Sequence, residues 1–153
     1  MPGIADAIHQ DRFESPAHRV LINLLYSAGW AKSLSTAALK PFGLTWQQFN
    51  CLRILRGQHG VAVSLRLIAD RMLDPQSNAS RIVDKLEAKE LVSRRPCPHD
   101  RRQVRIALTD AGRDLVERAS AEMRRGHEAI GGDLDAEELD QLSALLDRFR
   151  ETR

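Results

Sequence analysis

Apolar and polar residues follow two different periods between Ser64 and Thr109. The first part, SLRLIADRMLDPQSNASRIVDKLEAKEL, has two short patterns of helical period, and the rest has two strand-like alternations around a basic loop. In the second helical pattern an apolar stripe recurs at i, i+3, i+4 and i+7. The stripe is Ala79, Ile82, Val83 and Leu86, and the residues expected to face outward are Ser77, Arg81, Asp84 and Lys85. This order predicts a winged helix-turn-helix, which makes nucleic-acid binding the leading hypothesis.

Start and stop signals divide this central module into elements. Ser64 is expected to cap a helix over residues 65–73. Asp74 with Pro75 is expected to begin the next helix, whose first turn is then QSN. A short strand is expected over residues 61–63, paired with the wing.

A long helix is expected before the module. Ser15 has the character of an N-cap and Pro16 of a first helical residue, and apolar positions recur with helical spacing until Pro41. Thr45 and Gln48 then match a capping box, which predicts that a second helix begins there.

Two more helices are expected after the module. Thr109 is expected to cap a helix that fades near Gly131, and a last helix is expected from about Asp135. The apolar positions of the last helix are Leu139, Leu142, Leu145, Leu146 and Phe149. One winged helix cannot bury the stripes of the first and last helices, so we expect a second copy to cover them in a homodimer. The alternative is a monomer whose terminal helices fold back on each other.

The predicted fold is therefore mostly α with a small β-wing, in one domain over residues 1–153. Residues 45–108 form the expected DNA-binding lobe, and residues 15–40 and 109–150 the expected dimerisation helices. A length of 153 residues suits one domain with a sizeable core.

Charge is distributed unevenly along the chain, although the net charge is only +2. Residues 81–105 contain eight basic and four acidic residues, whereas residues 126–153 contain three arginines and eight carboxylates. The first segment suits phosphates and the second does not.

No apolar run is long enough to span a membrane, and the first 15 residues lack the layout of a signal peptide. We therefore expect a cytoplasmic protein. Cys51 lies among apolar residues and is expected to be a packed thiol, while Cys97 lies between two prolines in the basic loop and could oxidise.

An enzyme is the competitor from another class, because Cys97, His99 and Asp100 lie within four residues. Neighbours on one loop do not build a buried, water-excluding site, so no catalysis is expected. No cofactor or metal is expected either, because the histidines are scattered through the chain at positions 9, 18, 59, 99 and 127. A winged helix that binds only protein, and a redox sensor based on Cys97, remain as alternatives.

Two stretches, LIADRMLDPQSNASRIVDKLEAKELVSRRP and DRRQVRIALTDAGRDL, resemble the multiple-antibiotic-resistance regulator (MarR) family of dimeric winged-helix repressors. The most specific matches are the wing Asp-x-Arg, here Asp100 and Arg102, and the LTxxG sequence that ends at Gly112. The resemblance implies that Arg102 enters the minor groove and that Asp100 steadies the loop, which suits the negative potential of a narrow groove. The family usually has glycine where this chain has Glu90; a left-handed backbone there costs a non-glycine residue about 1 kcal/mol.

Helix geometry ranks the expected contacts with double-stranded DNA. Residues in the N-terminal half of a recognition helix lie deepest in the major groove, and those assigned to the bases are Gln76, Ser77, Asn78, Ser80 and Arg81. The residues assigned to phosphates and orientation are Ser64, Arg66, Lys85, Arg94 and Arg95.

The resemblance further implies an effector pocket between the dimerisation helices and the DNA-binding lobe, often for aromatic or phenolic compounds. Candidate lining residues are Tyr26, Trp30, Trp46, Phe49 and Arg53. Core or interface packing is the alternative role for each of them.

Overall fold

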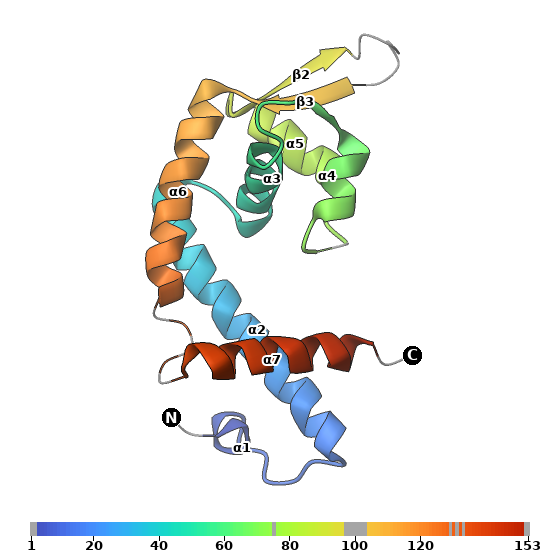
Figure 1. Cartoon of the computed structure of the whole chain (residues 1–153), viewed down its shortest axis with the longest axis vertical. Helices are drawn as coiled ribbons and strands as arrows, with labels where there is room; N and C mark the ends of the chain where they lie inside the picture. Colours follow the sequence, from blue (N-terminus) through green and yellow to red (C-terminus); the bar gives the residue numbers. More distant parts are fainter. Residues whose placement is uncertain are drawn as a thin grey trace.

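Two long helices carry a compact lobe at one end (Figure 1). The computed structural model describes residues 3–74, 76–96, 104–128, 130, 132 and 134–151. Helix α2 (Pro16–Leu39) and helix α6 (Asp110–Glu128) pack against each other and lead to the lobe. A short helix, α1 (Ile4–Ala7), precedes α2, and α7 (Ala136–Arg150) ends the described part of the chain.

The start of α2 follows the sequence prediction, and the α-helix ends two residues before the predicted end at Pro41. The Ser15 hydroxyl accepts a hydrogen bond from the His18 amide at 3.1 Å, and Pro16 is the first helical residue. The α-helix ends at Leu39 and continues as a 3-10 turn, η1 (Lys40–Phe42). Pro41 has no amide hydrogen to continue the α-helical ladder, so the chain tightens before that residue instead of at it.

The lobe consists of three helices and a small antiparallel sheet, as the sequence predicts for a winged helix. Its elements are α3 (Trp46–Arg56), β1 (Val63–Ser64), α4 (Leu65–Arg71), α5 (Ala79–Glu87), β2 (Val92–Pro96) and β3 (Val104–Leu108). The sheet order is β1-β3-β2, and Ile106 on β3 lies between Val63 and Arg94 in the register. Strand β1 begins two residues later than predicted, at Val63, because Val61 is 66% exposed and lies outside the sheet.

Helices α3 and α4 begin where the sequence predicts. Thr45 and Gln48 form a complete capping box on α3, and the Ser64 hydroxyl accepts from the Leu67 amide at 3.3 Å to cap α4. Helix α4 ends at Arg71, earlier than the predicted residue 73, because Met72 is extended and its side chain turns into the core.

The core lies between α3, α5, α6 and the inner face of the sheet. Its fully buried members include Phe49, Leu52, Val83, Ile106 and Val116. These residues come from α3, α5, β3 and α6, so α5 is held by the same core as the long helix α6.

Helix α5 ends in a Schellman motif around Glu90. The Leu91 amide bonds the Leu86 carbonyl at 3.0 Å, and the Glu90 amide bonds the Glu87 carbonyl at 2.8 Å. Glu90 itself has φ 58°, so the left-handed position considered in the sequence is present and a glutamate occupies it.

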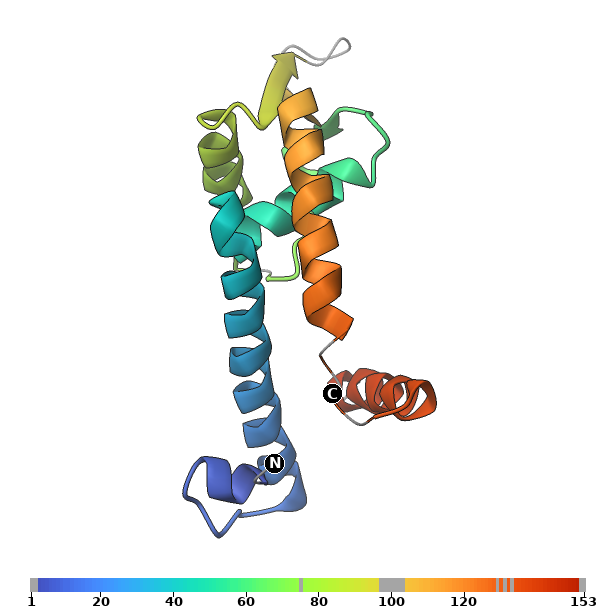
Figure 2. The same ribbon diagram turned by 90° about the vertical axis from the view of Figure 1, so that its left-hand side faces the viewer.

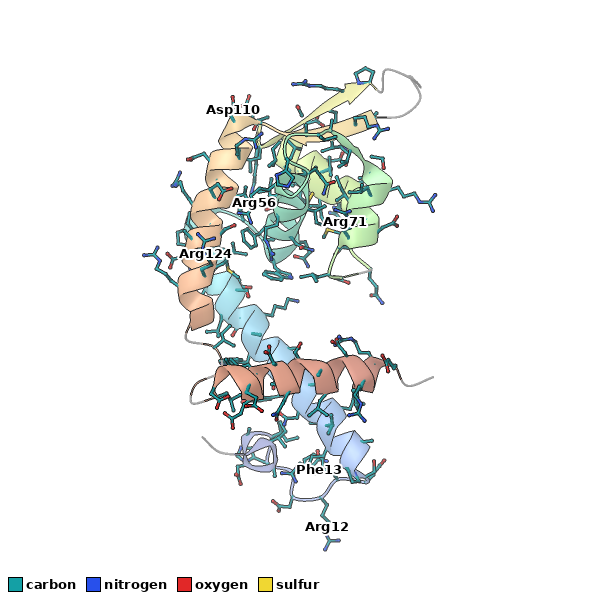
Figure 3. The ribbon with its side chains drawn as sticks, in the orientation of Figure 1. Arg12, Phe13, Arg56, Arg71, Asp110 and Arg124 are labelled. Atoms are coloured by element: carbon teal, nitrogen blue, oxygen red, sulfur yellow. The ribbon has the colours of Figure 1, made fainter. Side chains whose placement is uncertain are left out.

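The start of helix α6 is hydrogen-bonded to the residues that end α5. The Thr109 hydroxyl accepts from the Gly112 amide at 3.0 Å, which makes Thr109 the cap that the sequence predicts. The same hydroxyl donates to the Glu90 carbonyl at 2.7 Å. Lower on α6, Arg56 of α3 donates to Ser120 at 2.9 Å and pairs with Glu117 at 3.3 Å, and Figure 3 shows Arg56 where the two helices meet.

Helix α7 stands apart from the rest of the chain. It begins with a capping box on Asp135, as the sequence predicts. It crosses α2 in Figure 1, but the view turned by 90° separates the two helices (Figure 2). Leu142 and Leu145 on α7 are 47% and 57% exposed, and α2 exposes its own apolar side chains. The exposed apolar residues of α2 are Val20, Leu21, Leu25, Tyr26, Trp30 and Leu34. Within the described residues, none of the helices combines the length and apolar character needed to cross a membrane.

Candidate nucleic-acid interface

The recognition helix begins later than the sequence suggests. Asn78 is the N-cap of α5, and its side-chain oxygen accepts from the Arg81 amide at 3.0 Å. Asp74 does not start this helix; it closes a turn in which its carboxylate accepts from the Gln76 amide at 3.0 Å. The Asp74 carbonyl also accepts from the Ser77 amide at 3.0 Å. Gln76 and Ser77 therefore precede α5, and the prediction that QSN forms its first turn is wrong.

The two faces of α5 are as predicted, with one exception. Ala79, Val83 and Leu86 are buried, and Ile82 is half-buried. The opposite face exposes Ser80, Arg81, Asp84 and Lys85. The exception is Ser77, which the sequence placed outward: its hydroxyl is buried and finds no hydrogen-bond partner among the described residues. Because Ser77 precedes α5, it does not follow the helical period from which its direction was predicted.

A hollow of about 440 Å³ lies between the start of α3 and the start of α5. Its lining is mostly polar and includes two cations, Arg81 and Lys85, against one carboxylate, Asp74. The other lining residues are Thr45, Gln47, Gln48, Gln76, Ser77, Asn78 and Ile82. Amides and hydroxyls next to cations can donate to phosphate oxygens and base edges, so this surface suits nucleic acid.

Sequence reasoning missed the contribution of α3 to this surface. In the sequence, Thr45 and Gln48 indicate only the start of a helix and Gln47 is not singled out; their position beside α5 follows from the tertiary fold. Lys89 fixes that position, because its ammonium donates to the Gly43 carbonyl at 2.6 Å and to the Gln48 side-chain oxygen at 3.4 Å. The sequence gives one sign of this contact, the position of Lys89 shortly after the apolar stripe of α5.

The residues assigned to phosphates have different surroundings. Arg66 is exposed and lies 3.7 Å from Asp70, a weak surface pair. Arg95 is exposed on β2, and Ser64 is half-buried as the cap of α4. Arg94 differs from the other arginines because its guanidinium pairs with two carboxylates of α5. These ion pairs within the protein therefore compete with the predicted contact between Arg94 and a phosphate.

Asp100 and Arg102 lie outside the described residues, and so do Cys97 and His99. Their predicted roles remain predictions. Among the residues that the structure does describe, no cluster of three or more His, Cys, Asp or Glu side chains could hold a metal ion.

The candidate effector residues fall into two groups. On α3, the Trp46 and Phe49 rings are 6.2 Å apart and the Arg53 guanidinium lies 5.9 Å from the centre of the Phe49 ring. Phe49 is only 2% exposed, so its main role is in the core. Tyr26 and Trp30 on α2 are 51% and 45% exposed. The α2 pair thus lies on the apolar face that the isolated chain leaves uncovered.

Known proteins share this architecture. A model of the MarR family matches residues 42–103, which include most of the lobe. A MarR transcription factor from Planctomyces limnophilus is 35% identical, with 89% of this chain and 98% of that chain covered and a TM-score of 0.68. A mutant MarR from E. coli, solved with operator DNA, is 25% identical over 82% of this chain and 90% of that chain, with a TM-score of 0.73. BpsR of Bordetella bronchiseptica has the same fold, at 24% identity, 93% and 100% coverage and a TM-score of 0.80.

The match to the Planctomyces protein extends over nearly the full length of both chains, and the family match falls on the lobe that carries α4, α5 and β2. Both findings agree with the winged helix-turn-helix seen in the structure. The chain therefore belongs to the MarR family of DNA-binding transcriptional regulators, which are not enzymes.

Proposed function

We propose that this regulator is a homodimeric repressor that binds a pseudo-palindromic operator and leaves it when a small effector binds. The observation that carries the DNA contact is the exposed face of α5, where Arg81 and Lys85 border the polar hollow beside α3. Arg81 lies in the first turn of the helix, the part that reaches deepest into a major groove, and its guanidinium suits the O6 and N7 atoms of guanine.

The proposed dimer rests on the apolar faces of α2 and α7. Both helices expose large aliphatic or aromatic side chains along much of their length, and α7 stands clear of α2 within one chain. Exposed apolar patches of this extent mark interaction surfaces. In our proposal residues 45–108 act as the DNA-binding lobe, and α2, α6 and α7 form the dimerisation part of a single domain over residues 1–153.

The proposed effector site is the junction of α2 with α3, with Trp46 and Arg53 on α3 and the exposed Tyr26 and Trp30 farther along α2. Support comes from a relative of the same fold, BpsR, whose DNA binding is regulated by 6-hydroxynicotinic acid. An aromatic compound at this junction would lie against both α2 and the lobe. It can change the distance between the two recognition helices of the dimer only if it binds the DNA-competent and the incompetent spacing with different affinities.

The experiment is selection of bound sequences from random duplexes with the purified protein, followed by fluorescence anisotropy over a series of salt concentrations. A repressor of this design selects a site of roughly 16 to 20 base pairs with two related halves. Its affinity falls steeply with salt, because phosphate contacts release counterions. The competing class is a winged helix that binds only protein; enrichment of no sequence, with weak binding to every duplex, would favour that class. In our proposal this transcriptional regulator acts in the cytoplasm of a bacterial cell; the cytoplasm is the location expected from the sequence.

A further inference from the structure

We propose that Arg94 is a positioning residue that masks two carboxylates of the recognition helix from the DNA, and not itself a phosphate contact. This inference rests on the proposed DNA contact of α5. It concerns a different residue on a different element, the strand β2.

The guanidinium of Arg94 bridges two carboxylates that lie one turn apart on α5. Nη1 of Arg94 lies 2.9 Å from Oε2 of Glu87, and Nη2 lies 2.5 Å from Oδ1 of Asp84. Two different nitrogens of one planar guanidinium thus bind two carboxylates, an arrangement that the compact ammonium of lysine cannot reproduce. The strand holds the arginine in place, because Arg94 pairs in register with the buried Ile106.

Burial favours this engagement over a free arginine. The Arg94 side chain is 30% exposed, against 55% for Asp84 and 40% for Glu87. The arginine is therefore the most enclosed member of the group and the carboxylates are its outer members. Bringing Arg94 to a phosphate would break two charge-assisted bonds and leave both carboxylates uncompensated.

The position of the carboxylates explains why masking matters. Asp84 lies three residues after Arg81, one turn along the same face, and directly before Lys85. Unpaired carboxylates there would face DNA phosphates and oppose the attraction of the two cations. The pairing reduces the charge of the group formed by Arg94, Asp84 and Glu87 to −1, where the two carboxylates alone would carry −2.

The test is a charge-rescue experiment on the operator selected with the wild-type protein. Three variants are compared: Arg94→Met, the combination of Arg94→Met with Asp84→Asn and Glu87→Gln, and the matched control Arg95→Met, which removes the next arginine of the same strand. Dissociation constants are measured by anisotropy from low to physiological salt, and melting temperatures are measured in parallel.

Masking predicts that Arg94→Met weakens binding about tenfold at low salt and less at physiological salt, where the repulsion between the unmasked carboxylates and the phosphates is screened. The slope of log K against log salt therefore becomes shallower. The triple variant then binds within about threefold of the wild type, since the carboxylates that Arg94 masked are gone. Arg95→Met, if Arg95 contacts a phosphate, lowers that slope by about 1. Binding by the triple variant as weak as that of Arg94→Met would overturn the proposal, because neutral side chains at positions 84 and 87 cannot restore a lost phosphate contact.

A fourth variant keeps the test decisive if Arg94→Met does not fold. The double substitution Asp84→Asn with Glu87→Gln retains Arg94 and removes the charges that it masks. Masking predicts equal or tighter binding; weaker binding contradicts it. Failure of the wild-type protein to select any duplex is a separate result, which contradicts the proposed function and not the role of Arg94.

Discussion

Gly112 lies against the backbone of Leu91 so closely that a Cβ atom on the glycine would be 1.9 Å from the Leu91 carbonyl oxygen. Gly112 is in the first turn of α6, and Leu91 follows the end of α5. The Thr109 amide bonds the same carbonyl at 3.2 Å. The recognition helix and the long helix therefore meet backbone to backbone, which gives a physical reason for glycine in the LTxxG sequence.

We predict that Gly112→Ala destabilises the protein by at least about 2 kcal/mol, because backbone atoms must move to admit the methyl group. The matched control is Gly126→Ala on the same helix, where a Cβ has no neighbour within 4 Å. The control should be neutral or stabilising by up to about 1 kcal/mol, because alanine is the better helix former. Urea unfolding followed by circular dichroism measures both, and equal stabilities of the two variants would refute the contact.

Glu90 offers a stabilising substitution. Its φ of 58° favours glycine, so Glu90→Gly should raise the free energy of unfolding by up to about 1 kcal/mol, offset in part by the greater freedom of the unfolded chain. Ala88→Gly, two residues earlier at φ −60°, is the control and should lose about 1 kcal/mol. The same unfolding assay decides, and a loss of stability in Glu90→Gly would show that the glutamate side chain outweighs the backbone strain.

Cys51 should be inert in the folded protein. Burial raises the pKa of this thiol from 9.0 to about 12, so it is protonated at neutral pH and closed to reagents. In a Cys97→Ser variant, which leaves Cys51 as the only thiol, iodoacetamide at pH 8 should label the denatured protein and not the native one. The unfolded thiol ionises near pH 9 while the folded thiol does not, so the contribution of this group to stability is lost as the pH rises from 9 toward 12. Rapid labelling of the native variant, seen by mass spectrometry, would contradict the packed position.

The proposed dimer should depend on the apolar face of α7. Leu142→Asp combined with Leu146→Asp places two charges where each leucine would contribute roughly 1.5 to 3 kcal/mol on burial, so the dimer should dissociate. Sedimentation velocity measures the change. Ser143→Asp, an exposed polar position on the same helix, is the control and should leave the oligomeric state unchanged. A double variant that sediments like the wild-type dimer would exclude α7 from the interface.

Local signals in the sequence predicted most of the fold, and the start of α5 was mispredicted where two such signals lie close together. Ser15, Thr45, Ser64 and Asp135 each cap a helix where the pattern indicated, because a capping hydrogen bond needs only a few neighbouring residues. Between α4 and α5, both Asp74 and Asn78 are residue types that can cap a helix. Asn78, which is closer to the apolar stripe, caps α5, and Asp74 closes the turn before it.

The candidate site was harder to predict than the fold, because it depends on contacts between separate elements. The outward face of α5 follows from helical period, and Arg81 and Lys85 were found from it. Gln47 reaches the site from a helix that is distant in sequence, and the double ion pair of Arg94 joins α5 to the strand that follows it. No period or cap encodes either contact. Arg94 was therefore grouped with the exposed arginines, although its surroundings differ from theirs.

The measurement closest to the central claim is the affinity of Arg81→Ala for the selected operator and for a panel of sites mutated one base pair at a time. If the exposed face of α5 reads bases, this variant loses about 1 to 3 kcal/mol on the operator and no longer discriminates at one position of each half-site. Arg124→Ala is the control: Arg124 is an exposed arginine that Figure 3 shows on α6, away from the lobe, and its loss should change neither quantity. Equal losses of Arg81→Ala on operator and scrambled DNA would contradict base reading by this helix, and an unchanged affinity would contradict the interface altogether.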